Sequence, residues 1–135
     1  MANNYTLASF VVLMTEDQTD YAMDLYEKLE EDSDKSFLLA KQILDNPQFT
    51  GFRCTKEREG VWISHNDSID VENAAAFVYH LILKFDLPPV EFTWAEICDI
   101  PRLNEFSGGG IHISKENGIQ MWTPYIWFEQ LRNAK

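Results

Sequence analysis

The hydrophobic positions of the chain fall into short runs with period two and longer runs with a helical period. Residues 5–14 form a near-continuous apolar run, rich in aromatic and β-branched side chains, that is short enough for a strand. We expect this strand to be buried and central. After Thr15, which suits a helix N-cap, apolar side chains recur every three or four residues, so an amphipathic helix follows. The pattern pauses at residues 32–34 and resumes up to Pro47, which fits either one kinked helix or two.

Hairpin, helix and strand signals alternate through the rest of the chain. Residues 51–65 alternate around a charged tip that includes Gly60, which predicts a β-hairpin. Residues 71–85 carry apolar side chains at helical spacing and predict a largely buried helix, and residues 90–98 alternate as a strand does. A second hairpin is expected over residues 111–122, around an Asn-Gly turn.

A short helix is expected at the C-terminus, where Thr123 and Pro124 form an N-cap and first-turn pair. The order strand, helix, hairpin, helix, strand, hairpin, helix predicts an α+β fold. We expect a mostly antiparallel sheet of five to six strands with helices packed on one face. At 135 residues, with 45% apolar content, the chain is expected to form a single compact domain over residues 1–135.

The chain is strongly acidic, with 22 acidic against 11 basic side chains and a formal net charge of −11. Such a field repels phosphate backbones and attracts basic surfaces, so a protein partner is favoured and direct nucleic-acid binding is not expected. Nine of the acids lie within residues 16–34 beside one base, Lys28, which leaves a local charge of −8. A solvated helix face is one interpretation, and a surface for a basic partner is the other. The partner surface would comprise Glu16, Asp17, Asp20, Asp24, Glu27 and Glu31.

Targeting, redox and metal signals are few. The apolar run near the N-terminus is too short to span a bilayer and lacks a basic flank, so we expect a cytoplasmic protein without membrane contact. Cys54 and Cys98 do not make a disulfide framework and are expected as free thiols. His65, Asp67 and Asp70 have ligand chemistry, but a helix N-cap explains them better than a metal. We predict no cofactor, no metal and no catalytic residue.

Special side chains are densest after the predicted strand at residues 90–98. Ser107 and the three glycines after it lack the spacing and the lysine of a phosphate-binding loop, so a bulge or a close backbone crossing beneath Trp94 or Trp122 is favoured. If adjacent strands brought Cys98 and His112 together, a thiolate–imidazolium pair could serve nucleophilic catalysis. The alternative ligand site or small active site therefore comprises Cys98, Arg102, Glu105 and His112.

Aromatic side chains crowd the C-terminal segment, four of them within seven residues. They cannot all face one way on a short helix. We therefore expect part of the ring area to pack against the sheet and the remainder to anchor a protein interface. The four residues are Trp122, Tyr125, Trp127 and Phe128.

One stretch resembles uncharacterised small acidic proteins of phages and bacterial mobile elements. It comprises Trp94-Ala95, Cys98, Pro101-Arg102, Glu105-Phe106 and the glycines at 108–110. The resemblance covers about a quarter of the chain, and here Ser107 separates the phenylalanine from the glycines. It implies no established activity and carries over no catalytic residue. In type, though not in motif, the chain is also similar to the immunity and inhibitor proteins that neutralise toxins or defence enzymes.

Together these patterns favour a non-enzymatic binding protein of inhibitor or immunity type. It would cover a basic surface of another protein with its acidic helix and aromatic tail. One alternative is a small enzyme or anionic-ligand-binding domain with its site at residues 98–112. Another is a structural or assembly component of a larger particle. Homo-oligomerisation stays open, as do the identity of the partner and the strand order.

Overall fold

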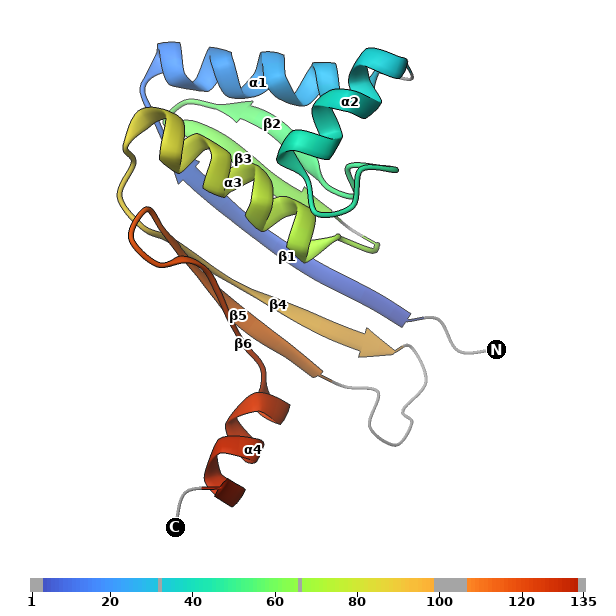
Figure 1. Ribbon diagram of the computed structural model, residues 1–135, viewed down its shortest axis with the longest axis vertical. Helices are drawn as coiled ribbons and strands as arrows, with labels where there is room; N and C mark the ends of the chain where they lie inside the picture. The colour runs from blue at the N-terminus through green and yellow to red at the C-terminus, as the bar shows by residue number, and fades with distance from the viewer. Residues whose placement is uncertain (1–3, 32, 66, 99–106, 134–135) are drawn as a thin grey trace.

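A computed structural model describes residues 4–31, 33–65, 67–98 and 107–133 of the chain (Figure 1). Within these ranges it contains six strands and four helices. In chain order they are β1 (Asn4–Leu13), α1 (Glu16–Glu30), α2 (Asp34–Ile43), β2 (Arg53–Glu57), β3 (Gly60–His65), α3 (Val71–Phe85), β4 (Val90–Cys98), β5 (Ser107–Ser114), β6 (Gly118–Trp122) and α4 (Pro124–Asn133).

The strands form one sheet in the order β2-β3-β1-β4-β5-β6, and every neighbouring pair is antiparallel. Helices α1, α2 and α3 cover one face of this sheet, whereas α4 continues beyond the end of β6 (Figure 1). The predicted α+β class, with helices on one face of a mostly antiparallel sheet, is confirmed.

Capping residues start the helices where the sequence predicts them. The Thr15 hydroxyl accepts a hydrogen bond from the Gln18 backbone at 3.3 Å, and the Gln18 side chain accepts one from the Thr15 backbone at 3.0 Å. Ser33 caps α2, and the extended backbone of Glu31 ends α1 before it, so two helices form instead of one kinked helix. Asp70 caps α3 as predicted.

The hydrophobic core lies between the sheet and the three helices that cover it. Along β1 the even-numbered side chains face the helices, and the buried Val12 pairs with the buried Val61 of β3. Helix α3 adds Phe77 and Leu81, both fully buried. The predicted burial of α3 is therefore confirmed.

No described helix packs on the opposite face of the sheet. Odd-numbered side chains of β1 point to that side, where Val11 is 48% exposed and Leu13 is 64% exposed. The prediction of a buried strand is thus right only for the side chains that face the helices, because burial of both sides requires a layer on each face. We call the uncovered surface the open face. Its central residues are Ser9, Val11, Leu13, Trp62, Thr93 and Ala95.

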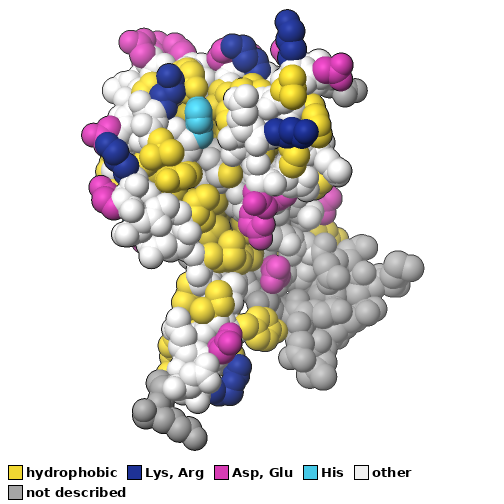
Figure 2. All heavy atoms as spheres, in the orientation of Figure 1, with side chains coloured by type: hydrophobic (Ala, Val, Ile, Leu, Met, Phe, Trp, Pro, Cys, Tyr) yellow, Lys and Arg dark blue, Asp and Glu magenta, His cyan; other side chains and the backbone are white. Residues whose placement is uncertain are grey.

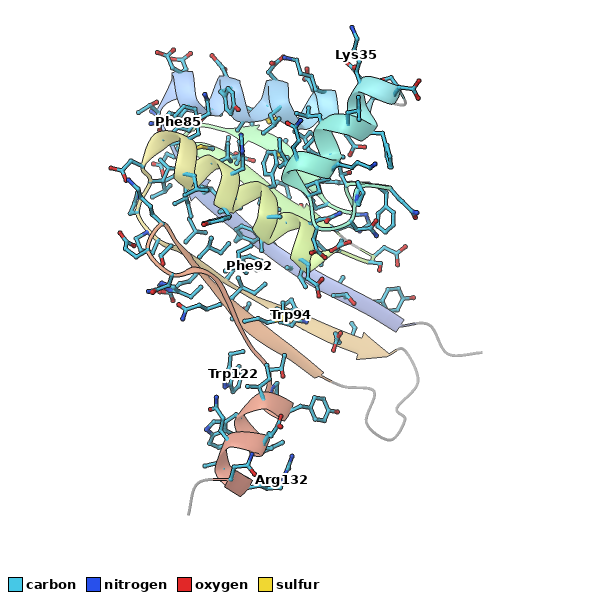
Figure 3. The ribbon with its side chains drawn as sticks, in the orientation of Figure 1. Lys35, Phe85, Phe92, Trp94, Trp122 and Arg132 are labelled. Atoms are coloured by element: carbon cyan, nitrogen blue, oxygen red, sulfur yellow. The ribbon has the colours of Figure 1, made fainter. Side chains whose placement is uncertain are left out.

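The glycine run lies inside β5, and close packing fixes two of its members. A Cβ at Gly108 would lie 2.4 Å from the backbone oxygen of Trp94. A Cβ at Gly109 would lie 2.3 Å from the backbone oxygen of Trp122 and 2.5 Å from the ring of Trp94. At Gly110 a Cβ would meet no atom closer than 3.8 Å. The two tryptophans come from the strands on either side, β4 and β6 (Figure 3). The predicted close crossing beside these tryptophans is confirmed.

A buried asparagine ties the segment between α2 and β2 to α3. Asn73 is fully buried, and its side-chain oxygen accepts a hydrogen bond from the backbone nitrogen of Asn46 at 2.7 Å. Its amide nitrogen donates to the backbone oxygens of Asn46, Phe49 and Thr50 at 2.9, 2.8 and 3.1 Å. Both polar atoms of the side chain are thereby paired, as burial requires.

Candidate functional site

The outer side of α1, together with its C-cap residue Glu31, carries the six acidic side chains predicted to meet a partner. At about 100° per residue, their positions all fall within one arc of about 100° around the helix. All six are exposed, and along the axis they extend over roughly 22 Å at about 1.5 Å per residue. We call this surface the acidic face. It comprises Glu16, Asp17, Asp20, Asp24, Glu27 and Glu31.

Two lysines neutralise part of the acidic face. Lys28 pairs with Asp24, and Lys56 of β2 pairs with Asp20, both at 2.9 Å. The hydrogen bond and the charge of each carboxylate raise the pKa of its lysine, so both lysines stay protonated at neutral pH. Within the described part of the chain, the other acids of the face form no ion pair; they are Glu16, Asp17, Glu27 and Glu31.

Helix α4 extends away from the body of the protein and buries none of its residues (Figure 1). Tyr125 is 55% exposed, and Trp127 and Phe128 are each 46% exposed, with ring centroids 5.6 Å apart. The structure corrects the expectation that part of this ring area is buried against the sheet, because α4 continues past β6 and does not fold back over it. Trp122, at the end of β6, is 45% exposed as well. The predicted aromatic tail is therefore an apolar projection, and Figure 2 shows hydrophobic side chains along it.

The alternative site is not assembled as predicted, because its cysteine and histidine lie far apart. The β4–β5 register pairs His112 with Glu91, whereas Cys98 lies seven residues further along β4. At about 3.4 Å per strand residue the two positions are roughly 24 Å apart, which excludes a thiolate–imidazolium pair. Instead, His112 Nδ1 lies 3.2 Å from Glu91 Oε1 in an exposed pair. Arg102, Glu105 and the side chain of Cys98 lie outside the described residues.

Two shallow hollows adjoin on the open face. One of about 660 Å³ includes His112 and Trp122 in its lining, and one of about 550 Å³ includes Trp62. Ser9 and Thr93 line both hollows. The Trp62 indole nitrogen donates to the Ser9 hydroxyl at 2.7 Å, which holds the ring across the sheet. Together the two hollows form one broad, open surface.

Two titratable groups outside these surfaces belong to the packing of the core. Cys54 is buried beside Met23, and burial raises the pKa of its thiol to about 12. A thiol of this pKa is no nucleophile at neutral pH. The ring of His80 lies 2.9 Å from the Tyr21 hydroxyl, and burial, followed by the charge of Lys84, lowers its pKa. His80 is therefore a neutral hydrogen-bond partner at neutral pH.

The residues that could have formed a metal site have other partners. The His65 Nδ1 accepts hydrogen bonds from the backbone nitrogens of Asp67 and Ser68, both at 3.1 Å. Asp70 caps α3 instead of facing this ring. Among the described residues, no group of three or more His, Cys, Asp or Glu side chains is arranged to hold a metal ion.

Comparisons with protein-family models, curated proteins and solved structures find no match to this chain. In the part that the structure describes, none of the helices has the length and apolar character needed to cross a membrane. The surfaces that remain as binding candidates are the acidic face, the open face and α4.

Proposed function

We propose that this protein is a non-enzymatic binding protein whose acidic face docks on a basic surface of another protein. The supporting observation is that six exposed carboxylates share one side of α1, four of them without an ion pair in the described chain. Complementary charge steers association and selects the partner. A partner whose basic surface serves its own activity would be blocked, so we infer a role of inhibitor or immunity type.

The energetics of α1 agree with such a role. Acids three or four residues apart, such as Glu27 and Glu31, repel each other by roughly 0.2–0.5 kcal/mol per pair. Two lysines offset part of this repulsion, and the remaining acids keep it when the protein is free. A basic partner would relieve the remaining repulsion as it binds, which adds to the affinity.

Affinity capture from a lysate of the source cell, at low and at high salt, tests the proposal. We expect a basic protein to be captured at low salt and lost at high salt, because salt screens exposed charges. The test variant combines Asp17→Asn, Glu27→Gln and Glu31→Gln, which removes three acids of the face and should abolish capture.

A matched control variant removes three exposed acids elsewhere, through Glu91→Gln, Glu116→Gln and Glu129→Gln. It carries the same net charge as the test variant and should still capture the partner. Equal capture by the wild type and the test variant, with the same salt dependence, would contradict the proposed role of the acidic face.

A further inference from the structure

Helix α4 has an apolar side that no described element covers. Pro124, Trp127, Phe128 and Leu131 recur at three- and four-residue intervals, so they share one side of the helix. We call these four residues the α4 stripe. The opposite side carries Glu129, Gln130 and Asn133 together with one apolar residue, Ile126. Trp127 and Phe128 are 46% exposed and Leu131 is 53% exposed. A helix of ten residues has little stability by itself, so a packing partner for the stripe is expected.

The open face has the layout of a protein interface. It exposes the apolar side chains of Val11, Leu13 and Trp62 by 48%, 64% and 39%, with the hydroxyls of Ser9 and Thr93 beside them. Charged side chains border it, among them Arg53 on the edge strand β2 and Glu91 on β4. Exposed apolar side chains bordered by polar ones are typical of surfaces that bind another protein. The hollows of about 660 and 550 Å³ indent this surface.

We propose that two copies of this chain form a two-fold dimer in which the α4 stripe of each copy packs into the open face of the other. The exchange covers both apolar surfaces of both copies and gives each sheet a helix on its second face. It is also closed, because the same contact occurs twice about the two-fold axis and leaves no site for a third copy. The dimer goes beyond the proposed function and does not depend on it.

The junction between β6 and α4 favours a second copy over the helix's own sheet. Only Thr123 separates Trp122, the last residue of β6, from Pro124, the first of α4. The Thr123 hydroxyl accepts a hydrogen bond from the Ile126 backbone at 3.2 Å, and its carbonyl oxygen accepts one from the Trp127 backbone at 3.1 Å. These hydrogen bonds fix the first turn of α4 directly after β6, and the helix continues away from its own sheet (Figure 1). A second copy can meet the stripe in this arrangement without a change in the direction of α4.

The available area reaches what a specific dimer needs. A large side chain such as an aromatic ring covers about 150–250 Å² when buried, and Trp127, Phe128 and Leu131 are about half exposed, so each stripe offers roughly 300 Å². The open face that receives a stripe loses a similar area. Two such contacts bury roughly 1,200 Å² in total, which is the lower end of the range of specific protein interfaces.

The charge distribution also permits this contact. Each copy carries a net charge of −11, so two copies approach only through surfaces that are close to neutral. The described part of α4 has one acid and one base, Glu129 and Arg132. The acidic face lies at the other end of the molecule, on the helix-covered side of the sheet (Figure 1). The proposed dimer therefore places both acidic faces on its outside.

Sedimentation velocity over a concentration series tests the dimer with three matched variants, each of which adds one glutamate. Trp127→Glu alters the stripe, Thr93→Glu alters the open face, and Leu38→Glu alters an exposed residue of α2 away from both. Far-ultraviolet circular dichroism checks the fold of each variant, and Ala95→Glu replaces Thr93→Glu if that chain does not fold.

We expect a wild-type dimer that Leu38→Glu preserves and that the other two variants weaken by roughly tenfold or more. Mixing the Trp127→Glu and Thr93→Glu chains should restore part of the association, because one stripe and one open face are then intact in the same pair. A wild type that stays monomeric up to its solubility limit would overturn the proposal. So would a dimer that Thr93→Glu leaves unchanged, or a mixture that associates no better than its components.

Discussion

Replacement of Gly109 by alanine is expected to destabilise the fold, whereas the same replacement at the neighbouring Gly110 is not. At Gly109 the added Cβ would lie 2.3 Å from the backbone oxygen of Trp122 and 2.5 Å from the ring of Trp94, far inside van der Waals contact. Trp94 is only 9% exposed, so a shift of its ring also disturbs the core. Overpacking costs about 1–3 kcal/mol, and we expect about 2 kcal/mol here.

The expected effect at Gly110 has the opposite sign. The nearest atoms would lie 3.8 and 3.9 Å from the added Cβ, which is ordinary contact. Alanine there restricts the unfolded chain and should stabilise the fold by about 0.4–1 kcal/mol. Urea unfolding followed by circular dichroism measures both free energies, and Gly110→Ala controls for the loss of a glycine as such. Equal unfolding midpoints for the two variants would refute the steric argument.

Three further outcomes follow from buried polar groups. Asn73→Ala removes four hydrogen bonds and leaves backbone groups unpaired, so we expect a loss of about 3–4 kcal/mol in urea unfolding; a loss below about 1 kcal/mol would contradict this. In a Cys98→Ser chain, Cys54 should resist iodoacetamide at about pH 8 until the chain unfolds, and fast labelling of the folded chain would count against its burial. Because burial raises the pKa of Cys54 from 9.0 to about 12, the stability linked to this thiol is present below pH 9.0 and is lost as the pH rises toward 12. The pKa of His80 is lowered from 6.5, so the stability linked to this ring is present above pH 6.5 and is lost as the pH falls. Lys84→Gln should raise the pKa of His80 in an NMR titration. An unchanged pKa would exclude the lysine as a cause of the shift.

The helix starts could be predicted because their signals are local. Thr15, Ser33, Asp70 and Thr123 each accept a hydrogen bond from a backbone nitrogen three residues further on, and a helix begins at each of them. The acidic face could be predicted for the same reason, since all its members belong to one helical segment whose period fixes the side they share.

The degree of burial could not be predicted from the apolar run of β1. Such a run indicates which side chains are hydrophobic, but their exposure depends on whether a layer packs above each face of the sheet. Val12 faces the helix-covered side and is buried, whereas its neighbours Val11 and Leu13 face a side on which no described helix packs. The exposure of the aromatic tail could not be predicted for the same reason, because it depends on the direction in which α4 leaves β6 and not on the composition of the segment.

Contacts across the sheet could not be predicted because alternation leaves the register free. The sequence indicates correctly that the strands of Cys98 and His112 have an apolar alternating pattern, and these strands, β4 and β5, are neighbours. The register nevertheless places Glu91 opposite His112 and leaves Cys98 at the far end of β4. A pair of residues on adjacent antiparallel strands meets only when the register aligns them, so their presence on neighbouring strands is weak support for a shared site.

The proposed dimer and the proposed complex with a basic partner should respond to salt in opposite directions. Each copy carries a charge of −11, and this repulsion opposes dimer formation until salt screens it, over about 8 Å at physiological ionic strength. The contact through α4 is apolar, so we expect the affinity between the two copies to stay the same or to rise as sodium chloride is added. The complex of the acidic face should weaken, because there salt screens an attraction. One series of sodium chloride concentrations measures both responses. Sedimentation gives the salt dependence of the dimer dissociation constant, and a binding titration gives that of the complex with the captured partner. A dimer that dissociated on addition of salt would be held by charge pairs, and the apolar contact through α4 would then be wrong.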